Sequence, residues 1–121
     1  MRTFLTLGAI SAGISVAAGA FGAHALRARL TPGDLAIYET AARYEMYHAL
    51  ALVAVALVLE RWPGALAQWA GWLFVAGTCI FSGSLYLLVL SGQRWLGAVT
   101  PIGGVAFLAG WTCLALHAAR R

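Results

Sequence analysis

Apolar residues along this chain form four long runs, and short polar segments with Arg, Pro or Gly separate them. A membrane-spanning helix needs about 20 predominantly apolar residues to cross the hydrocarbon core. Residues 3–26, 65–90 and 96–119 each meet this length without an Asp, Glu, Lys or Arg. The pattern predicts an all-α integral membrane protein. We expect a single domain over residues 1–121, a four-helix bundle that runs up-down-up-down with short loops.

The second span is harder to place, because its apolar run over residues 46–59 is too short to cross a bilayer alone. Before it, Thr31-Pro32-Gly33-Asp34 has the composition of a helix start, with a capping Thr, a Pro and an early acid. We expect an amphipathic lead-in over residues 32–43 and a span over about residues 40–60. Glu45 and His48 would then lie inside the membrane boundary.

Two segments leave alternatives open. Ala23-His24-Ala25 imitates the cleavage site of a secretory signal peptide, but the run before it exceeds the 7–15 residues that are usual for one, so we favour an uncleaved helix. In the fourth run, either Thr100 caps a helix that starts at Pro101, or Pro101 distorts the first turn of one longer helix. We favour the distorted turn.

Composition supports the membrane assignment, because 62% of the residues are hydrophobic and only 10% are charged, against about 25% in soluble domains. The net charge of +4 comes from eight arginines beside the apolar runs, which is typical of topology signals and not of a nucleic-acid surface. The side of the termini would carry Arg2, Arg61, Arg120 and Arg121, and the other side Arg27, Arg29 and Arg94. This small excess predicts that both termini are cytoplasmic, in the cell (inner) membrane.

Most of the unusual polar residues fall in the half of the predicted bundle opposite the termini. Glu45 and His48 are three residues apart and Tyr44 and His48 four apart, so they share a helix face. A lone intramembrane carboxylate costs roughly 2–3 kcal/mol on insertion scales. We therefore expect Glu45 to be paired, with His24, Arg43 or a Tyr hydroxyl. The candidate binding cluster comprises His24, Tyr44, Glu45, His48, Ser82, Ser84, Tyr86 and Thr100.

This cluster has two interpretations, a polar clasp that only holds the helices together or a site for a ligand or ion. We expect His24 and His48 to lie within reach of one another. A metal held by these two and Glu45 is a weaker alternative without an HxxxH motif, and we predict no metal and no other cofactor. Cys79 and Cys113 are expected to be free thiols. Small residues expected at helix contacts are Ser11, Ser15, Gly19, Gly83, Gly103 and Gly104.

Several short motifs also carry a family resemblance. They are GAFGAHAL at 19–26, YxxxHALAL at 44–52, FSGSLY at 81–86, LSG at 90–92, TPIGG at 100–104 and GW at 110–111. Together they resemble the domain-of-unknown-function 423 family, which includes YgdD-like proteins and transmembrane protein 256. The resemblance covers essentially the whole chain and implies a small four-span membrane protein without an established activity. Members of that family often carry Gln in place of Glu45, which shifts the expected functional role towards His24 and His48.

Short loops and the lack of a soluble domain favour a non-enzymatic scaffold or an accessory subunit of a larger membrane complex. The expected partners are the lipid bilayer and either further copies of the chain or other membrane subunits, with no nucleic acid. One alternative is a component of an ion, proton or small-solute channel or transporter. The other is a metal- or haem-binding membrane subunit, which would need His24 and His48 to face one another.

Overall fold

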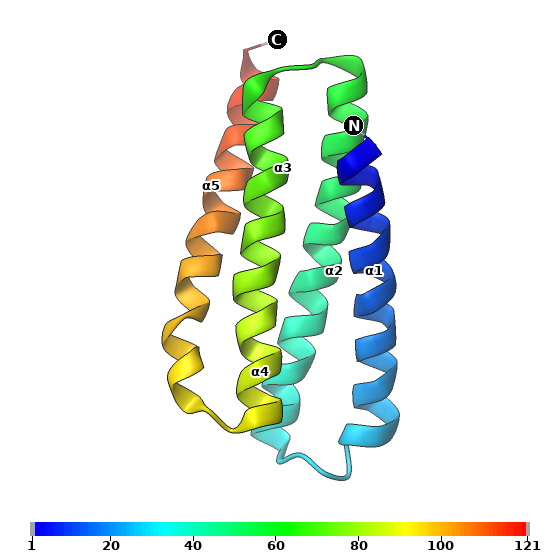
Figure 1. The fold of residues 1–121 in the computed structure, drawn as a ribbon, viewed down its shortest axis with the longest axis vertical. Coiled ribbons are helices and arrows are strands. Elements are labelled where there is room, and N and C mark those ends of the chain that lie inside the picture. Colours follow the sequence, from blue (N-terminus) through cyan, green and yellow to red (C-terminus); the bar gives the residue numbers. More distant parts are fainter. Residues whose placement is uncertain (1, 121) are drawn as a thin grey trace.

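The computed structural model describes residues 2–120, which form long antiparallel helices joined by short connections (Figure 1). The elements are α1 (Arg2–Phe21), η1 (Gly22–Leu26), α2 (Pro32–Arg61), α3 (Ala65–Gly77), η2 (Thr78–Ser82), α4 (Gly83–Ser91), η3 (Arg94–Ala98) and α5 (Thr100–Ala119). They make up four stretches long and apolar enough to cross a membrane: Arg2–Leu26, Pro32–Arg61, Ala65–Ser91 and Arg94–Ala119. The predicted all-α, four-helix membrane bundle is confirmed.

Both ends of the described chain lie at the same end of the bundle, which we call side A (Figure 1). Side A also carries the connection over residues 62–64, and side B carries the connections over 27–31 and 92–93. On side A, His117 of α5 contacts the connection between α2 and α3, because its Nε2–H donates to the Trp62 carbonyl at 2.7 Å. The alternation of direction follows from connections too short to cross the membrane.

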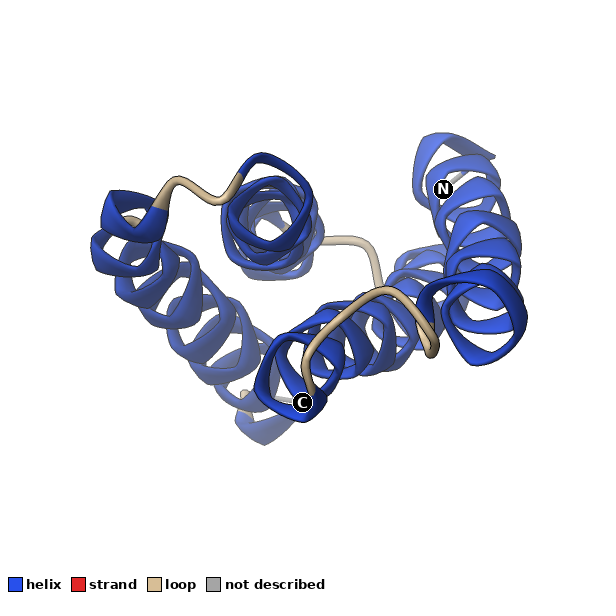
Figure 2. Cartoon of the chain, turned by 90° about the horizontal axis from the view of Figure 1, so that it is seen from below, coloured by secondary structure: helices blue, strands red, loops and turns tan. Residues whose placement is uncertain are grey.

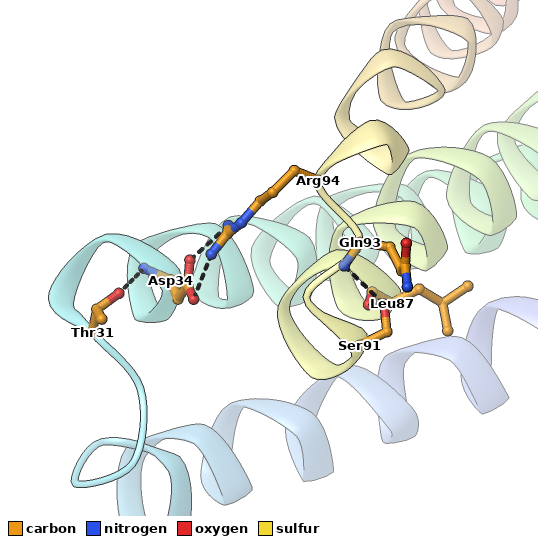
Figure 3. Close-up of polar contacts among 6 residues, drawn as sticks. All are labelled: Thr31, Asp34, Leu87, Ser91, Gln93 and Arg94. Carbon is orange, nitrogen blue, oxygen red and sulfur yellow. Dashed lines mark hydrogen bonds and ion pairs between the residues drawn. The ribbon is translucent and has the colours of Figure 1, made fainter.

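The start of α2 is set by the predicted cap. The Thr31 hydroxyl accepts a hydrogen bond from the Asp34 backbone N–H at 3.1 Å, and Pro32 occupies the first turn, where its missing N–H costs nothing (Figure 3). From there α2 runs without a break for 30 residues. The amphipathic lead-in and the span are therefore one helix, about 45 Å long at a rise of 1.5 Å per residue.

This length changes where the polar residues of α2 lie. Glu45 and His48 sit near the middle of the helix instead of near its side-B end. Both are buried, with 5% of each residue exposed. The carboxyl group of Glu45 and the imidazole of His48 thus lie at mid-bundle depth, where water does not compensate for their burial.

Two of the four spans contain a π-helical turn, η1 after α1 and η2 between α3 and α4. A π turn carries more residues per turn than the α-helix around it, and such turns occur frequently at functional sites. Here η2 joins α3 and α4 into one membrane-spanning stretch. It faces α2 and α5, and its Ser82 hydroxyl donates to the Ala41 carbonyl of α2 at 2.7 Å.

The main core lies where α2, α3 and α5 meet, with Phe4 of α1 added on side A. Its large members include Phe4, Leu52, Phe74 and Phe107. By contrast, α1 packs mainly along α2 and lies at one edge of the bundle in the view from side B (Figure 2). A second, smaller core near side B contains Tyr38 and Leu88.

Of the glycines predicted at helix contacts, only Gly103 makes a close one; the others that do, such as Gly8, were not predicted. A Cβ at Gly8 would lie 2.8 Å from the Ala49 carbonyl, and one at Gly103 would lie 2.4 Å from the Phe81 backbone nitrogen. Ser11 and Ser15 do face α2, as hydrogen-bond donors. At Gly19, Gly83 and Gly104 an added Cβ would meet no described atom within 4 Å. Their expected role in helix packing within the chain is therefore wrong, because they lie off the contacting faces.

On side B, an ion pair fixes the connection between α4 and η3 to the start of α2. Arg94 donates to both carboxylate oxygens of Asp34, at 2.9 and 3.0 Å (Figure 3). The residues before Pro101 form the 3₁₀ turn η3, and α5 begins at Thr100. Thr100 is not a cap; its hydroxyl donates back to the Leu96 carbonyl. The distorted first turn is thus the better description of this segment.

Candidate functional site

Glu45 is held between α1 and α4 by two hydroxyl groups. Ser11 of α1 donates to Oε2 at 3.1 Å, and Tyr86 of α4 donates to Oε1 at 2.9 Å. The predicted pairing of Glu45 with a Tyr hydroxyl therefore holds. The sequence interpretation missed Ser11, which it treated only as a packing residue. The two donors are neutral hydroxyls, so neither described hydrogen-bond partner of Glu45 is a cationic side chain.

The carboxylate lies at the floor of a groove of about 340 Å³ between α1 and the α3–η2–α4 stretch, with α2 beneath. Ligand pockets typically span about 300–1,000 Å³, so this groove is of a size to hold a small molecule. The lining residues are Leu7, Ile10, Ser11, Ile14, Glu45, Leu52, Val75, Thr78, Cys79, Ser82, Gly83 and Tyr86. They lie within the membrane-spanning stretches, at least five residues from the end of each, so the groove opens sideways between helices.

Aromatic contacts bound the groove at both ends. Towards side A, the Phe4 ring crosses from α1 to Gly71 and packs edge-on against Trp72, with ring centroids 5.0 Å apart. Towards side B, Tyr38 packs edge-on against Tyr86 at 5.4 Å, and its hydroxyl donates to the Ala18 carbonyl of α1. Tyr38 was not among the predicted site residues. Along α1, these contacts at Phe4 and Ala18 lie on either side of the residues that line the groove.

One polar atom in the groove wall is unsatisfied. Thr78 Oγ1 is buried and has no hydrogen-bond partner among residues 2–120. A helical Thr usually bonds the carbonyl four residues earlier. A buried hydroxyl without a partner costs about 1–3 kcal/mol. Thr78 begins η2 and lines the groove, so its hydroxyl joins those of Ser11, Ser82 and Tyr86 and the carboxyl of Glu45 as the polar groups in otherwise apolar walls.

His48 has a separate and closed environment on the neighbouring part of α2 that faces α3 and α5. Its ring stacks on Phe107 of α5, with centroids 3.5 Å apart, and lies 5.5 Å from Phe74 of α3. Nδ1–H donates to the Tyr44 carbonyl at 2.9 Å, and Nε2 accepts from the Trp111 indole N–H at 3.1 Å. Both ring nitrogens are used, which fixes a neutral tautomer in which Nδ1 carries the proton.

The other predicted residues are distributed over several contacts. Ser84 Oγ shares a hydrogen bond with Thr100 Oγ1 and joins α4 to α5. The Tyr44 ring packs against Phe81 at 5.0 Å and is partly exposed. Of the predicted cluster, Glu45, Ser82 and Tyr86 line the groove. His24 lies in η1 and is exposed.

The expected approach of His24 and His48 is wrong. His48 is buried against α3 and α5, whereas His24 is exposed on η1, which follows α1 at the other edge of the bundle. Across residues 2–120, no group of three or more His, Cys, Asp and Glu side chains is arranged to hold a metal ion. A metal site from His24, His48 and Glu45 therefore does not fit this arrangement. Cys79 and Cys113 are free, as predicted.

Trp111 is a further site residue that the sequence interpretation missed. Its indole N–H completes the hydrogen bonding of His48, and its ring packs against Phe74 at 4.8 Å. The only available signal was its place in the GW motif at 110–111, because a Trp in an apolar helix otherwise indicates packing or an interface.

Comparisons with known proteins agree with the fold. A family model described as a protein of unknown function (DUF423) matches residues 18–104. A UPF0382 membrane protein of Staphylococcus aureus (strain bovine RF122 / ET3-1) is 46% identical over 114 residues, 94% of this chain and 93% of that protein. The UPF0382 membrane protein YwdK of Bacillus subtilis (strain 168) is 43% identical over 121 residues, 99% of this chain and 98% of its own. No solved structure matches the chain.

Proposed function

The chain belongs to the DUF423 family of proteins of unknown function, and we propose that it is a non-enzymatic membrane protein that binds an amphipathic molecule from the bilayer. The observation that carries the proposal is the lateral groove between α1 and α3–η2–α4, with the hydrogen-bonded Glu45 at its floor. An intramembrane ionisable residue is a candidate functional site by default, and here it faces a space of ligand size.

The shape of the groove supports a ligand that enters from the lipid phase. Its walls are mostly apolar, and its lining residues lie at least five residues from the ends of their membrane-spanning stretches. A molecule dissolved in the bilayer reaches such a site sideways, whereas a polar solute from water would need a path along the helices. Glu45, Tyr86 and Thr78 would orient the polar part of the ligand.

The test uses two glycines that differ in position but not in local space. Gly83 lines the groove and Gly104 lies on α5 outside it; at each, an added Cβ would meet no described atom within 4 Å. We expect Gly83→Leu to fill the groove and Gly104→Leu to leave it open. Wild type and both variants would be purified in mild detergent from native membranes and extracted for small-molecule mass spectrometry.

The expected result is a lipid-soluble compound that copurifies with wild type and Gly104→Leu and is lost from Gly83→Leu. Equal small-molecule content in all three preparations would contradict groove binding. If a membrane polypeptide is lost from Gly83→Leu instead, the groove holds a partner helix.

An accessory-subunit role is the second candidate, supported by the small residues left uncovered on the outside of the bundle. Gly13 and Gly19 of α1 and Gly104 of α5 have open space where a Cβ would be, and small residues of this kind allow close helix approach in lipid. Further copies of the chain or a larger membrane complex would supply the partner helices. Size-exclusion chromatography with light scattering of the same preparations measures the assembly.

We also propose that both termini face the cytoplasm. The support is the arginine distribution, with Arg2, Arg61 and Arg120 towards side A and Arg27, Arg29 and Arg94 towards side B; Arg121 follows Arg120 in the sequence. A C-terminal green fluorescent fusion should then be fluorescent, and a C-terminal alkaline phosphatase fusion inactive. The opposite pattern would place side A outside.

A further inference from the structure

We propose that the groove selects lipophilic organic cations, molecules with an apolar body and one positively charged nitrogen. This inference rests on the proposed function, because it names the class of ligand for the same groove. The ligand class is inferred from the side chains that surround Glu45.

The charge in the groove is not balanced by another side chain. On α1, Ser11 faces the Glu45 carboxylate, and on α4, Tyr86 does; both are neutral hydroxyl donors. The other titratable group in the lining is the thiol of Cys79 on η2, and the described lining contains no Arg, Lys or His. On α2 itself, His48 is neutral and is bonded to Tyr44 and Trp111. A cation is therefore the chemical complement of this site.

The hydrogen bonds to Glu45 leave room for such a contact. Each carboxylate oxygen accepts one hydroxyl, and a carboxylate offers about four acceptor sites in total. A positively charged nitrogen can approach the carboxylate from the groove without displacing Ser11 or Tyr86. In a low-dielectric environment the attraction between opposite charges is much stronger than in water.

The walls then decide which kind of cation fits. The side chains of Leu7, Ile10, Ile14, Leu52 and Val75 offer apolar contact and no oxygen ligands. Hard metal cations need six or more oxygen ligands or retained water, which these walls do not provide. An organic cation brings an apolar body that the walls can cover. An amphiphile whose polar part is an anion would be repelled by Glu45.

The experiment uses a matched pair of fluorescent probes, an N-methylated styrylpyridinium dye and the same styrylpyridine without the methyl group. At mildly alkaline pH the first is a permanent cation and the second is neutral. The full chain is placed in phosphatidylcholine nanodiscs, and each dye is titrated by fluorescence anisotropy against empty nanodiscs. The variants are Glu45→Gln, which keeps the shape but removes the charge, and Glu60→Gln, which removes an exposed carboxylate on side A outside the groove.

We expect wild type and Glu60→Gln to bind the cation at least about tenfold more tightly than the neutral dye. In Glu45→Gln the ratio of the two dissociation constants should fall towards one, with binding of the neutral dye unchanged. Gly83→Leu should weaken the binding of both dyes. This result would locate the dyes in the groove even if Glu45→Gln proves unstable.

Three results would overturn the inference. Equal affinity of the two dyes for wild type, or an unchanged ratio in Glu45→Gln, would mean that the groove binds amphiphiles without selecting charge, and the proposed function would stand. Binding of the cation that Gly83→Leu does not weaken would place it outside the groove and contradict both proposals.

Discussion

The polar residues on two neighbouring faces of α2 differ in how they are enclosed. On the face towards α3 and α5, His48 is stacked on Phe107, and both of its ring nitrogens are bonded within the chain. On the face towards α1 and α4, Glu45 is bonded to two hydroxyls but lies at the floor of an open groove, which is also lined by Thr78, whose buried Oγ1 is unsatisfied. We call these the closed face and the open face.

The difference separates a structural role from a binding role within one turn of helix. A buried imidazole whose donors and acceptors are all satisfied gains nothing from a ligand, and it specifies how α5 packs. A carboxylate with unused acceptor sites beside an uncovered space has capacity for one. Glu45 and His48 are only three residues apart, so sequence spacing alone could not distinguish these roles.

The largest expected effect comes from tightening the contact behind the closed face. Gly103→Ala places a Cβ against the Phe81 backbone, which cannot move aside as a side chain could. We expect a loss of roughly 1–3 kcal/mol in the free energy of unfolding, as for other overpacked contacts. Differential scanning fluorimetry of thermal unfolding in detergent measures the change.

The neighbouring Gly104→Ala is the control for that substitution. Its Cβ would meet no described atom within 4 Å, so the stability should be unchanged or slightly higher, since Ala favours helix over Gly by up to about 1 kcal/mol. Equal effects of the two substitutions would contradict the contact geometry of α5.

The second effect tests whether His48 is purely structural. His48→Leu removes the stacking on Phe107 and leaves the Trp111 indole N–H without its acceptor. We expect a loss of about 2 kcal/mol in stability from these two terms together. Dye binding to the open face, measured as above at a temperature where the variant is folded, should be unchanged. A loss of binding with no loss of stability would reverse the roles of the two faces.

The third effect concerns Glu45 and is smaller. Glu45→Gln keeps an acceptor for the hydroxyls and removes the cost of burying a charge, so it should be tolerated. Glu45→Leu leaves Ser11 and Tyr86 without their acceptor and should be less stable than Gln by about 1 kcal/mol. A thermal-shift series in which Leu equals or exceeds Gln would contradict the hydrogen-bonded arrangement of the open face.

The smallest effect belongs to the ion pair on side B, which joins α2 to the α4–η3 connection. Asp34→Asn should lower the thermal midpoint by less than any substitution above, because exposed ion pairs contribute little. The remaining difference from wild type should shrink further at high salt, where such charges are screened. A midpoint change as large as that of His48→Leu would show that side B controls the packing of both faces.

Most of the fold could be predicted from the sequence because membrane crossing depends on the length of apolar runs. The start of α2 was also predictable, since Thr31, Pro32 and Asp34 satisfy the local hydrogen bonding of a helix end. The location of Glu45 at the middle of α2 was not, because the polar residues before it suggested a shorter span.

The partners of the site residues depend on how each helix is rotated about its axis, and the sequence does not fix that rotation. Residues of α1 and α5 are apolar on nearly all sides, so no single face indicates the interior. This is why Ser11 and Trp111 were not recognised as partners of Glu45 and His48, and why His24 was placed beside His48. Tyr86 was a member of the predicted cluster, but the sequence did not single it out among the Tyr hydroxyls that could pair with Glu45.

The π turn η2 acts as a phase adjustment between the two halves of the third span. Each residue advances an α-helix by about 100°, so the extra residue of a π turn resets the direction in which every later side chain points. Removal of one residue from Thr78–Ser82 would restore a regular α-helix and turn α4 by that angle relative to α3. Tyr86 would then point away from Glu45, and Ser84 away from Thr100. The angular setting of this one turn therefore decides whether α4 makes its polar contacts with α2 and α5.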